Sequence, residues 1–95
     1  YGGEEFIAIV LGGDARPVFE LVKKILREIE ERHIPHPSNP SGWVTVSSGG
    51  VTVVPQLENE YNSYLKVADA MLYDAKNFGR NQVVWYGDDL KQWRE

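Results

Sequence analysis

The chain is short, acidic and free of cysteine: it has 95 residues, a formal net charge of −4 and no Cys. A chain of this length forms one domain with a modest core, and the lack of Cys excludes disulfides, thiolate metal sites and Cys nucleophiles. Its 42% hydrophobic and 25% charged residues are typical of a folded globular protein, and the acidic balance argues against nucleic acids and anionic membranes as its main partners.

The first segments predict a strand followed by an amphipathic helix. Residues 6–11 are apolar at odd-numbered and even-numbered positions alike, which is typical of a strand buried on both faces. A Gly-Gly pair ends this strand, and Asp14 is a suitable N-cap for the helix that we expect from residue 15 to about residue 33. Apolar residues recur there at helical spacing, and the charged residues between them, Arg27 and Glu30 included, are interpreted as a solvated face. The apolar stripe consists of Val18, Leu21, Val22, Ile25, Leu26 and Ile29.

The middle of the chain predicts a loop and then β structure. Three prolines between residues 34 and 42 break regular structure, and His33 and His36 are interpreted as surface residues rather than metal ligands. Residues 43–54 are rich in β-branched side chains and are interrupted by Ser-Gly-Gly. They predict either one strand with a glycine bulge or two strands joined by a turn.

The C-terminal third predicts a second helix and a last strand. Residues 63–78 have apolar residues at helical spacing, and Gly79 follows them as a suitable C′ residue. Residues 82–86 predict a short strand, and the remainder of the chain is interpreted as polar tail. The expected order is therefore β-α-β-α-β, which predicts an α/β fold with a mixed sheet flanked by helices.

The first six residues carry the most informative motif. Gly2 and Gly3 supply the positive φ that a two-residue hairpin turn requires, and they let a bulky ligand approach bare backbone. Glu4 and Glu5 follow at the mouth of the sheet, where a carboxylate together with substrate phosphates suits Mg²⁺. Neighbours on a strand point to opposite faces, so only one of the two is expected to bind the metal. From spacing alone, a hairpin turn with two solvated glutamates is the simpler interpretation.

Four motifs occur in a fixed order along the chain. Residues 2–6 read Gly-Gly-Glu-Glu-Phe, and residues 34–38 read Ile-Pro-His-Pro-Ser. Residues 44–51 begin Val-Thr-Val-Ser-Ser-Gly, and residues 68–81 begin Ala-Asp-Ala-Met-Leu-Tyr and end Gly-Arg-Asn. This combination resembles the GGDEF family, the diguanylate cyclases, with the signature in its GGEEF form. The resemblance covers nearly all of residues 1–87 and implies a nucleotide-cyclase-like GGDEF fold.

The resemblance implies an enzyme that condenses two GTP molecules into cyclic di-GMP and releases pyrophosphate, assisted by Mg²⁺ or Mn²⁺. If the roles of the family's motif residues are transferred to the matching positions of this sequence, Glu4 would bind the metal and help to activate the attacking 3′-hydroxyl group. Glu5 would support the metal site, so both glutamates are candidate catalytic residues. Gly2 and Gly3 would let the phosphates and the ribose of GTP approach the turn.

Two cations complete the site that the resemblance implies. Lys76 and Arg80 would bind the terminal phosphates of GTP, because phosphoryl transfer needs positioned positive charge. Without the family pattern, the dipole of the second helix is the simpler explanation of cations at this end. Asp69, Tyr73 and Asn81 also match the family pattern, but helix packing and capping explain them adequately.

The chain starts at Tyr1 rather than Met, and the family has a further βα stretch before its signature. We therefore expect residues 1–87 to be the C-terminal part of a GGDEF domain and residues 88–95 to be a polar C-terminal tail. On this interpretation a second metal-binding aspartate, the guanine-binding residues and the inhibitory RxxD motif would lie upstream, so the chain alone would be inactive. An unpaired strand at residues 6–11 would also invite strand exchange or dimer formation.

The expected partners are GTP as substrate, cyclic di-GMP as product and a second copy of the chain in a catalytic homodimer. We expect no nucleic acid, no membrane contact by this segment, and a cytoplasmic location in bacterial second-messenger signalling, whether or not a longer parent is membrane-anchored. One alternative is a catalytically silent GGDEF module that binds GTP or cyclic di-GMP as a sensor. A remote alternative is a ferredoxin-like RNA-binding module, if residues 43–54 form two strands, although the net charge argues against it.

Overall fold

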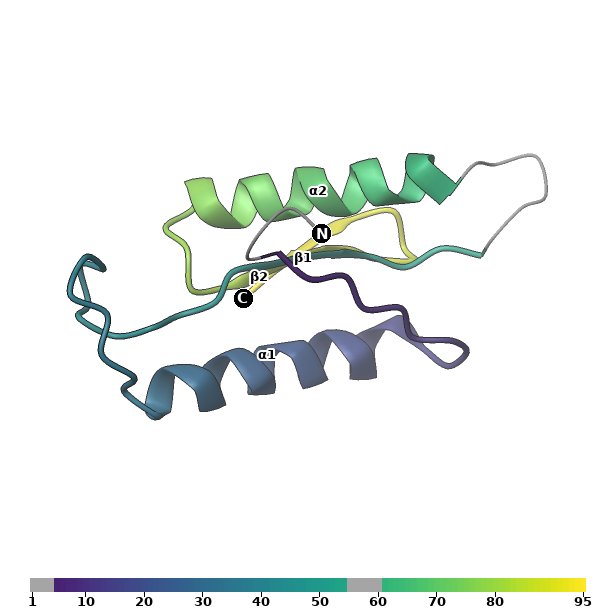
Figure 1. Ribbon diagram of the computed structural model, residues 1–95. Helices are drawn as coiled ribbons and strands as arrows, with labels where there is room; N and C mark the ends of the chain where they lie inside the picture. The colour runs from purple at the N-terminus through teal and green to yellow at the C-terminus, as the bar shows by residue number, and fades with distance from the viewer. Residues whose placement is uncertain (1–4, 55–60) are drawn as a thin grey trace.

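The fold is a mixed three-stranded sheet between two helices, as a computed structural model shows for residues 5–54 and 61–95 (Figure 1). The strands lie in the order β1-β2-β3, with β1 parallel to β2 and β3 antiparallel to it. The predicted α/β class with a mixed sheet is therefore confirmed. Neither described helix is both long enough and apolar enough to cross a membrane. The elements are α1 (Ala15–Glu31), β1 (Ser48–Val51), α2 (Tyr61–Asn77), β2 (Val83–Tyr86) and β3 (Gln92–Arg94).

Strand β2 is the centre of the molecule because both of its faces are buried. Val83 and Val84 are fully buried, and as neighbours on a strand they point to opposite faces. Val83 packs with Phe19 and Leu26 of α1, whereas Val84 packs with residues of α2. The two helices therefore cover the two faces of the same strand, which Figure 1 shows as three layers.

Strand β1 lies close to the backbone of α2, and this approach depends on glycine. A Cβ atom built at Gly49 would overlap the backbone nitrogen of Leu72. A Cβ atom at Gly50 would overlap the ring of Trp85 on the other face of the sheet. The Gly-Gly pair is thus neither a bulge nor a turn but the middle of one strand, and the two-strand interpretation of residues 43–54 is wrong.

Residues 6–11 do not form the predicted buried strand. They belong to no strand, and their side chains are exposed, with Phe6 at 94% and Leu11 at 90%. A strand is held by hydrogen bonds to a neighbouring strand, and no described strand pairs with this segment. Apolar composition alone therefore did not suffice to form a strand at residues 6–11. Pairing of this segment with a second copy of the chain stays a prediction.

The C-terminal residues form a strand where the sequence predicts a polar tail. In β3, Trp93 pairs with Trp85 of β2, and the Glu95 backbone exchanges two hydrogen bonds with Val83 at 2.8 and 3.0 Å. Trp93 also packs on the core, where its ring meets that of Phe19 edge to face at 5.5 Å. One aromatic side chain between polar neighbours thus attaches this segment to the sheet.

Helix α1 confirms the predicted helix but presents a different buried face. Phe19 is fully buried although the predicted stripe omits it, while Leu21 and Ile25 of that stripe are exposed at 54% and 44%. The helix turns Phe19 and Leu26 toward β2, because the aromatic rings of that sheet face lie there. Asp14 is the N-cap residue as predicted, but its side chain makes no capping hydrogen bond.

We expect Gly49→Ala to destabilise the fold by about 3 kcal/mol, because the new methyl group meets rigid helix backbone rather than a movable side chain. Urea unfolding measures this effect. The matched control is Ser48→Ala on the same strand, for which we expect a change of less than about 1 kcal/mol. Equal effects of the two substitutions would show that β1 and α2 do not approach as closely as described.

The ion pair between Lys23 of α1 and Glu95 makes stability depend on pH. The hydrogen bond from Lys23 to Glu95 (2.7 Å) lowers the pKa of the Glu95 carboxyl and raises the pKa of Lys23. The stabilisation is therefore present at neutral pH and is lost as the pH falls through the lowered pKa of Glu95. Glu95→Gln should reduce the melting temperature slightly at pH 7 and not at all below that pKa. A decrease of the same size at both pH values would contradict this assignment.

Candidate functional site

The C-terminal end of α2 holds the two predicted phosphate-binding cations. Gly79 has a φ of 121° and ends the helix as predicted. The Arg80 N–H donates to the Ala75 carbonyl at 2.9 Å and the Gly79 N–H to the Lys76 carbonyl at 3.4 Å, which is the Schellman pattern. Lys76 therefore lies in the last helical turn and Arg80 directly after it, where the helix dipole favours positive charge.

A shallow groove of about 290 Å³ lies beside this helix end and is lined by Glu5, Asp69, Leu72, Tyr73 and Lys76. Asp69, Tyr73 and Lys76 are spaced at i, i+4 and i+7 and so share one face of α2. Across the groove, the Glu5 Oε2 atom is 3.6 Å from the Lys76 Nζ atom. Both side chains are more than a third exposed, so this ion pair is weak and leaves both groups accessible to a ligand.

The structure brings together two of the predicted site residues, Glu5 and Lys76. Arg80 is exposed on the turn after α2 and is not among the residues that line the groove. Gly2, Gly3 and Glu4 lie outside the described residues, so their predicted roles stay predictions. Asp69 and Tyr73, which the sequence explains by helix packing, border the groove instead.

The groove has the donor atoms of a site for a divalent cation shared with a substrate. The side chains of Glu5 and Asp69 supply carboxylate oxygens, the ligands that Mg²⁺ prefers. Within residues 5–54 and 61–95, no three His, Asp or Glu side chains are grouped to hold a metal by themselves. Mg²⁺ commonly takes only one or two carboxylates and completes its shell with water and phosphate, so this donor set fits it.

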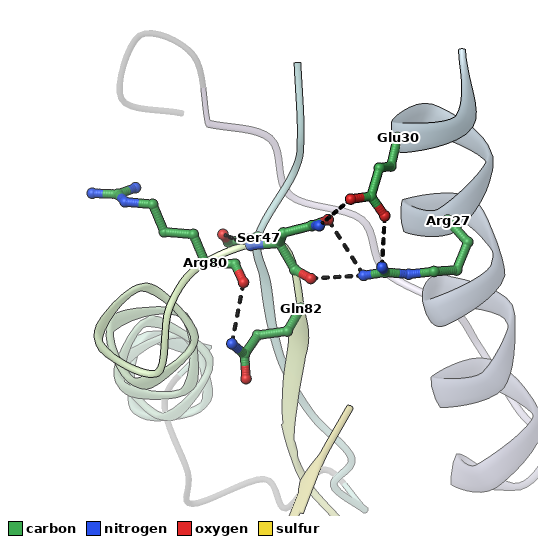
Figure 2. A network of polar contacts seen from close by, with 6 residues as sticks. Arg27, Glu30, Ser47, Arg80 and Gln82 are labelled. Atoms are coloured by element: carbon green, nitrogen blue, oxygen red, sulfur yellow. Dashed lines mark hydrogen bonds and ion pairs between the residues drawn. The ribbon is translucent and has the colours of Figure 1, made fainter. Parts of the chain in front are cut away.

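A polar network connects α1 to the turn that carries Arg80 (Figure 2). Arg27 donates to the backbone carbonyl of Asn81 at 2.6 Å and to its Oδ1 atom at 3.3 Å. The Asn81 amide group donates to Glu30 at 2.7 Å, and Arg27 also donates to Glu30 at 2.7 Å. Ser47 accepts a hydrogen bond from the Asn81 N–H at 3.1 Å. The predicted solvated face of α1 therefore includes two residues that hold a distant turn.

Sequence reasoning missed this network because its members are far apart in the chain. Arg27 and Glu30 are three residues apart, a spacing that predicts an ion pair on a helix surface and nothing more. Asn81 lies 54 residues beyond Arg27. Its place directly after Gly-Arg was the one available signal, because asparagine tolerates the left-handed conformation that follows a helix C-cap.

The chain is similar to a known protein family and to several curated proteins. The chain matches the family described as "Diguanylate cyclase, GGDEF domain" over residues 1–82. It is 34% identical over 87 residues to diguanylate cyclase VdcA of Vibrio cholerae, covering 88% of this chain and 25% of that protein. It is also 34% identical over 90 residues to diguanylate cyclase A of Treponema denticola, covering 95% of this chain and 24% of that protein.

A third relative is the probable diguanylate cyclase DgcC of Escherichia coli K12, with 30% identity over 83 residues, 87% of this chain and 22% of that protein. The chain thus spans about a quarter of the length of these curated relatives. No solved structure matches it significantly. On the match to residues 1–82, the chain belongs to the GGDEF family of diguanylate cyclase domains.

Proposed function

We propose that this chain supplies phosphate-binding and metal-binding residues to a diguanylate cyclase. In that reaction the 3′-hydroxyl oxygen of one GTP attacks the α-phosphorus of another, the hydroxyl proton is removed and pyrophosphate leaves. Two such steps give cyclic di-GMP. The observation that carries the proposal is the pairing of Glu5 with Lys76 across a groove at the end of α2, with Arg80 directly beyond.

Lys76 and Arg80 are proposed to bind the terminal phosphates of GTP. These phosphates become the leaving pyrophosphate, so positive charge beside them stabilises the charge that develops as the bond breaks. Lys76 is an adaptable point charge, whereas the planar guanidinium of Arg80 can donate two parallel hydrogen bonds to one phosphate. The exposure of both side chains supports a role in binding a ligand rather than in packing.

The carboxylates are proposed to hold Mg²⁺ or Mn²⁺ and to act on the attacking hydroxyl group. Glu4 is proposed as the metal ligand that also helps to activate this hydroxyl, with Glu5 as support and Gly2 and Gly3 as the close approach for GTP. A divalent ion, when bound, offsets negative charge on the phosphoryl group in transfer. The presence of Glu5 in the groove supports this assignment for the motif as a whole.

The proposed reaction requires two GTP-binding sites that face each other. Because each GTP must attack the other, two nucleotides have to be held facing each other, and we propose a homodimer for this purpose. We further propose a cytoplasmic protein in second-messenger signalling, with GTP as substrate and cyclic di-GMP as product. The names of its relatives as diguanylate cyclases support this assignment.

A catalytically silent module that binds GTP or cyclic di-GMP is the second candidate. The exposed cations at the end of α2 suit a nucleotide ligand whether or not the ligand reacts. The RNA-binding alternative depended on two strands within residues 43–54, where the described structure has only β1.

Removing either proposed phosphate-binding cation should weaken nucleotide binding. We expect Lys76→Ala and Arg80→Ala each to lower the affinity for GTP in the presence of Mg²⁺ about tenfold, because each loses a hydrogen bond between charged groups. Isothermal titration calorimetry measures the dissociation constant. Lys24→Ala, which removes an exposed cation from α1, is the control and should leave the affinity unchanged. Unchanged affinity in both site variants would exclude this phosphate site.

The purified 95-residue chain should make no cyclic di-GMP from GTP and Mg²⁺. The chain spans only about a quarter of the length of its curated relatives, and its described residues group no three His, Asp or Glu side chains that could hold a metal by themselves. Chromatography of the reaction mixture detects the product. Formation of cyclic di-GMP above a Glu4→Gln control would contradict the expectation and show that these residues suffice.

A further inference from the structure

The turn between α2 and β2 has an unusual backbone. Three consecutive residues are left-handed: Gly79 has a φ of 121°, Arg80 of 63° and Asn81 of 51°. Glycine adopts such angles freely, but an L-residue such as arginine does so only where its surroundings enforce the conformation. Within the turn, the Arg80 N–H donates to the Ala75 carbonyl at 2.9 Å and the Gln82 side chain donates to the Arg80 carbonyl at 3.1 Å. Asn81 receives further support from outside the turn.

The support comes from α1 through the polar groups of Asn81. The Arg27 guanidinium binds both the backbone carbonyl and the side-chain oxygen of Asn81, and Glu30 accepts a hydrogen bond from its amide nitrogen. The Asn81 N–H donates to Ser47, in the segment that leads into β1. The backbone and both side-chain polar atoms of Asn81 are thus held from α1 and from the segment before β1. We call Arg27, Glu30 and Asn81 the clamp.

The ion pair within the clamp, between Arg27 and Glu30, contributes little to stability. The side chains of Arg27 and Glu30 are 45% and 32% exposed, and ion pairs at such positions contribute little to the free energy of unfolding. What the contacts do determine is geometry, because the Nη2 atom of Arg27 donates to two acceptors of Asn81 while its Nη1 atom is held by Glu30. The residue fixed in this way directly follows Arg80.

We propose that Asn81, held by Arg27 and Glu30, is a positioning residue for the phosphate-binding side chain of Arg80. Arg80 has a long side chain with several rotatable bonds, so the placement of its backbone decides which region beside the end of α2 its guanidinium can reach. In Figure 2 this side chain extends away from α1, which carries Arg27 and Glu30. These two residues bind Asn81, the residue after Arg80. The proposal rests on the proposed function, in which Arg80 binds phosphate.

The first experiment measures the dissociation constant of inorganic pyrophosphate for the chain by calorimetry. We expect Arg27→Met to weaken binding about fivefold, a typical coupling between residues of one network. Arg27→Lys should lie between the wild type and Arg27→Met, because lysine keeps the charge but loses the fork. Arg32→Met is the matched control, since it removes an exposed arginine from the end of the same helix. Equal affinity in Arg27→Met and this control would overturn the proposal.

A double-mutant cycle shows whether the clamp acts through Arg80. In the Arg80→Ala background, Arg27→Met should cause no further loss of pyrophosphate affinity. A general weakening of the fold would instead lower affinity in both backgrounds, and that result would overturn the proposal. Thermal unfolding of each variant identifies the folded fraction, and we expect the melting temperature to change little.

A third variant separates the backbone angle from the hydrogen bonds. Asn81→Gly adopts the left-handed conformation easily but removes both side-chain contacts to α1. We expect it to bind pyrophosphate as weakly as Arg27→Met does. Wild-type affinity in Asn81→Gly would show that the turn alone positions Arg80, contrary to the proposal.

Backbone dynamics provide a readout that does not depend on a ligand. The NMR order parameter of the Arg80 amide should fall from about 0.85 in the wild type to below about 0.6 in Arg27→Met and Asn81→Gly. Unchanged order in both variants would overturn the proposal even if affinity falls. If the wild type fails to bind pyrophosphate while the order parameters behave as expected, the clamp stands and the proposed phosphate site does not.

Discussion

The burial of β2 on both faces is the constraint on which the rest of this structure depends. Val83 and Val84 are fully buried on opposite sides of one short strand, and each contributes about 1.5 to 3 kcal/mol by leaving water. Helix α1 packs on one of these valines and α2 on the other, so the strand sets the positions of both helices. The start of this strand also ends the turn that carries Arg80. Val83 of the core therefore follows Arg80 of the candidate site after only two intervening residues.

The candidate site depends on how α2 ends rather than on a deep pocket. The Schellman pattern at Gly79 ends the helix, so that Lys76 lies in its last turn and Arg80 just beyond it. Both cations are therefore at the negative end of the helix dipole. Glu5 reaches the same place from the N-terminal segment. An open groove lined by Lys76 and two carboxylates, with Arg80 nearby, suits a reaction in which substrate and metal bring much of the charge. The clamp adds to this arrangement a contact between α1 and the turn before β2.

Local patterns predicted those elements whose formation is itself local. The helical spacing of apolar residues identified α1 and α2, and Gly79 marked the helix end, because capping involves only neighbouring residues. Strand pairing is not local, and the two wrong predictions both concern it. Residues 6–11 were predicted to be a strand but have no described partner strand. Residues 92–94 were predicted to be tail but form β3, in which Trp93 pairs with Trp85. The predicted stripe omitted Phe19, although Phe19, Val22 and Leu26 are also at helical spacing, because spacing alone does not show which of several apolar stripes faces the sheet.

The sequence by itself determined the family, because the order of the four motifs can be read along the chain without knowledge of the tertiary structure. It also identified Glu5, Lys76 and Arg80 as residues of interest, because motif residues can be carried over one position at a time. Only the tertiary structure decided that Glu5 meets Lys76, and that Arg27 and Glu30 hold Asn81. Such contacts join residues more than fifty positions apart, and their geometry follows from how α1 and α2 pack on β2. No pattern within a single segment contains that information.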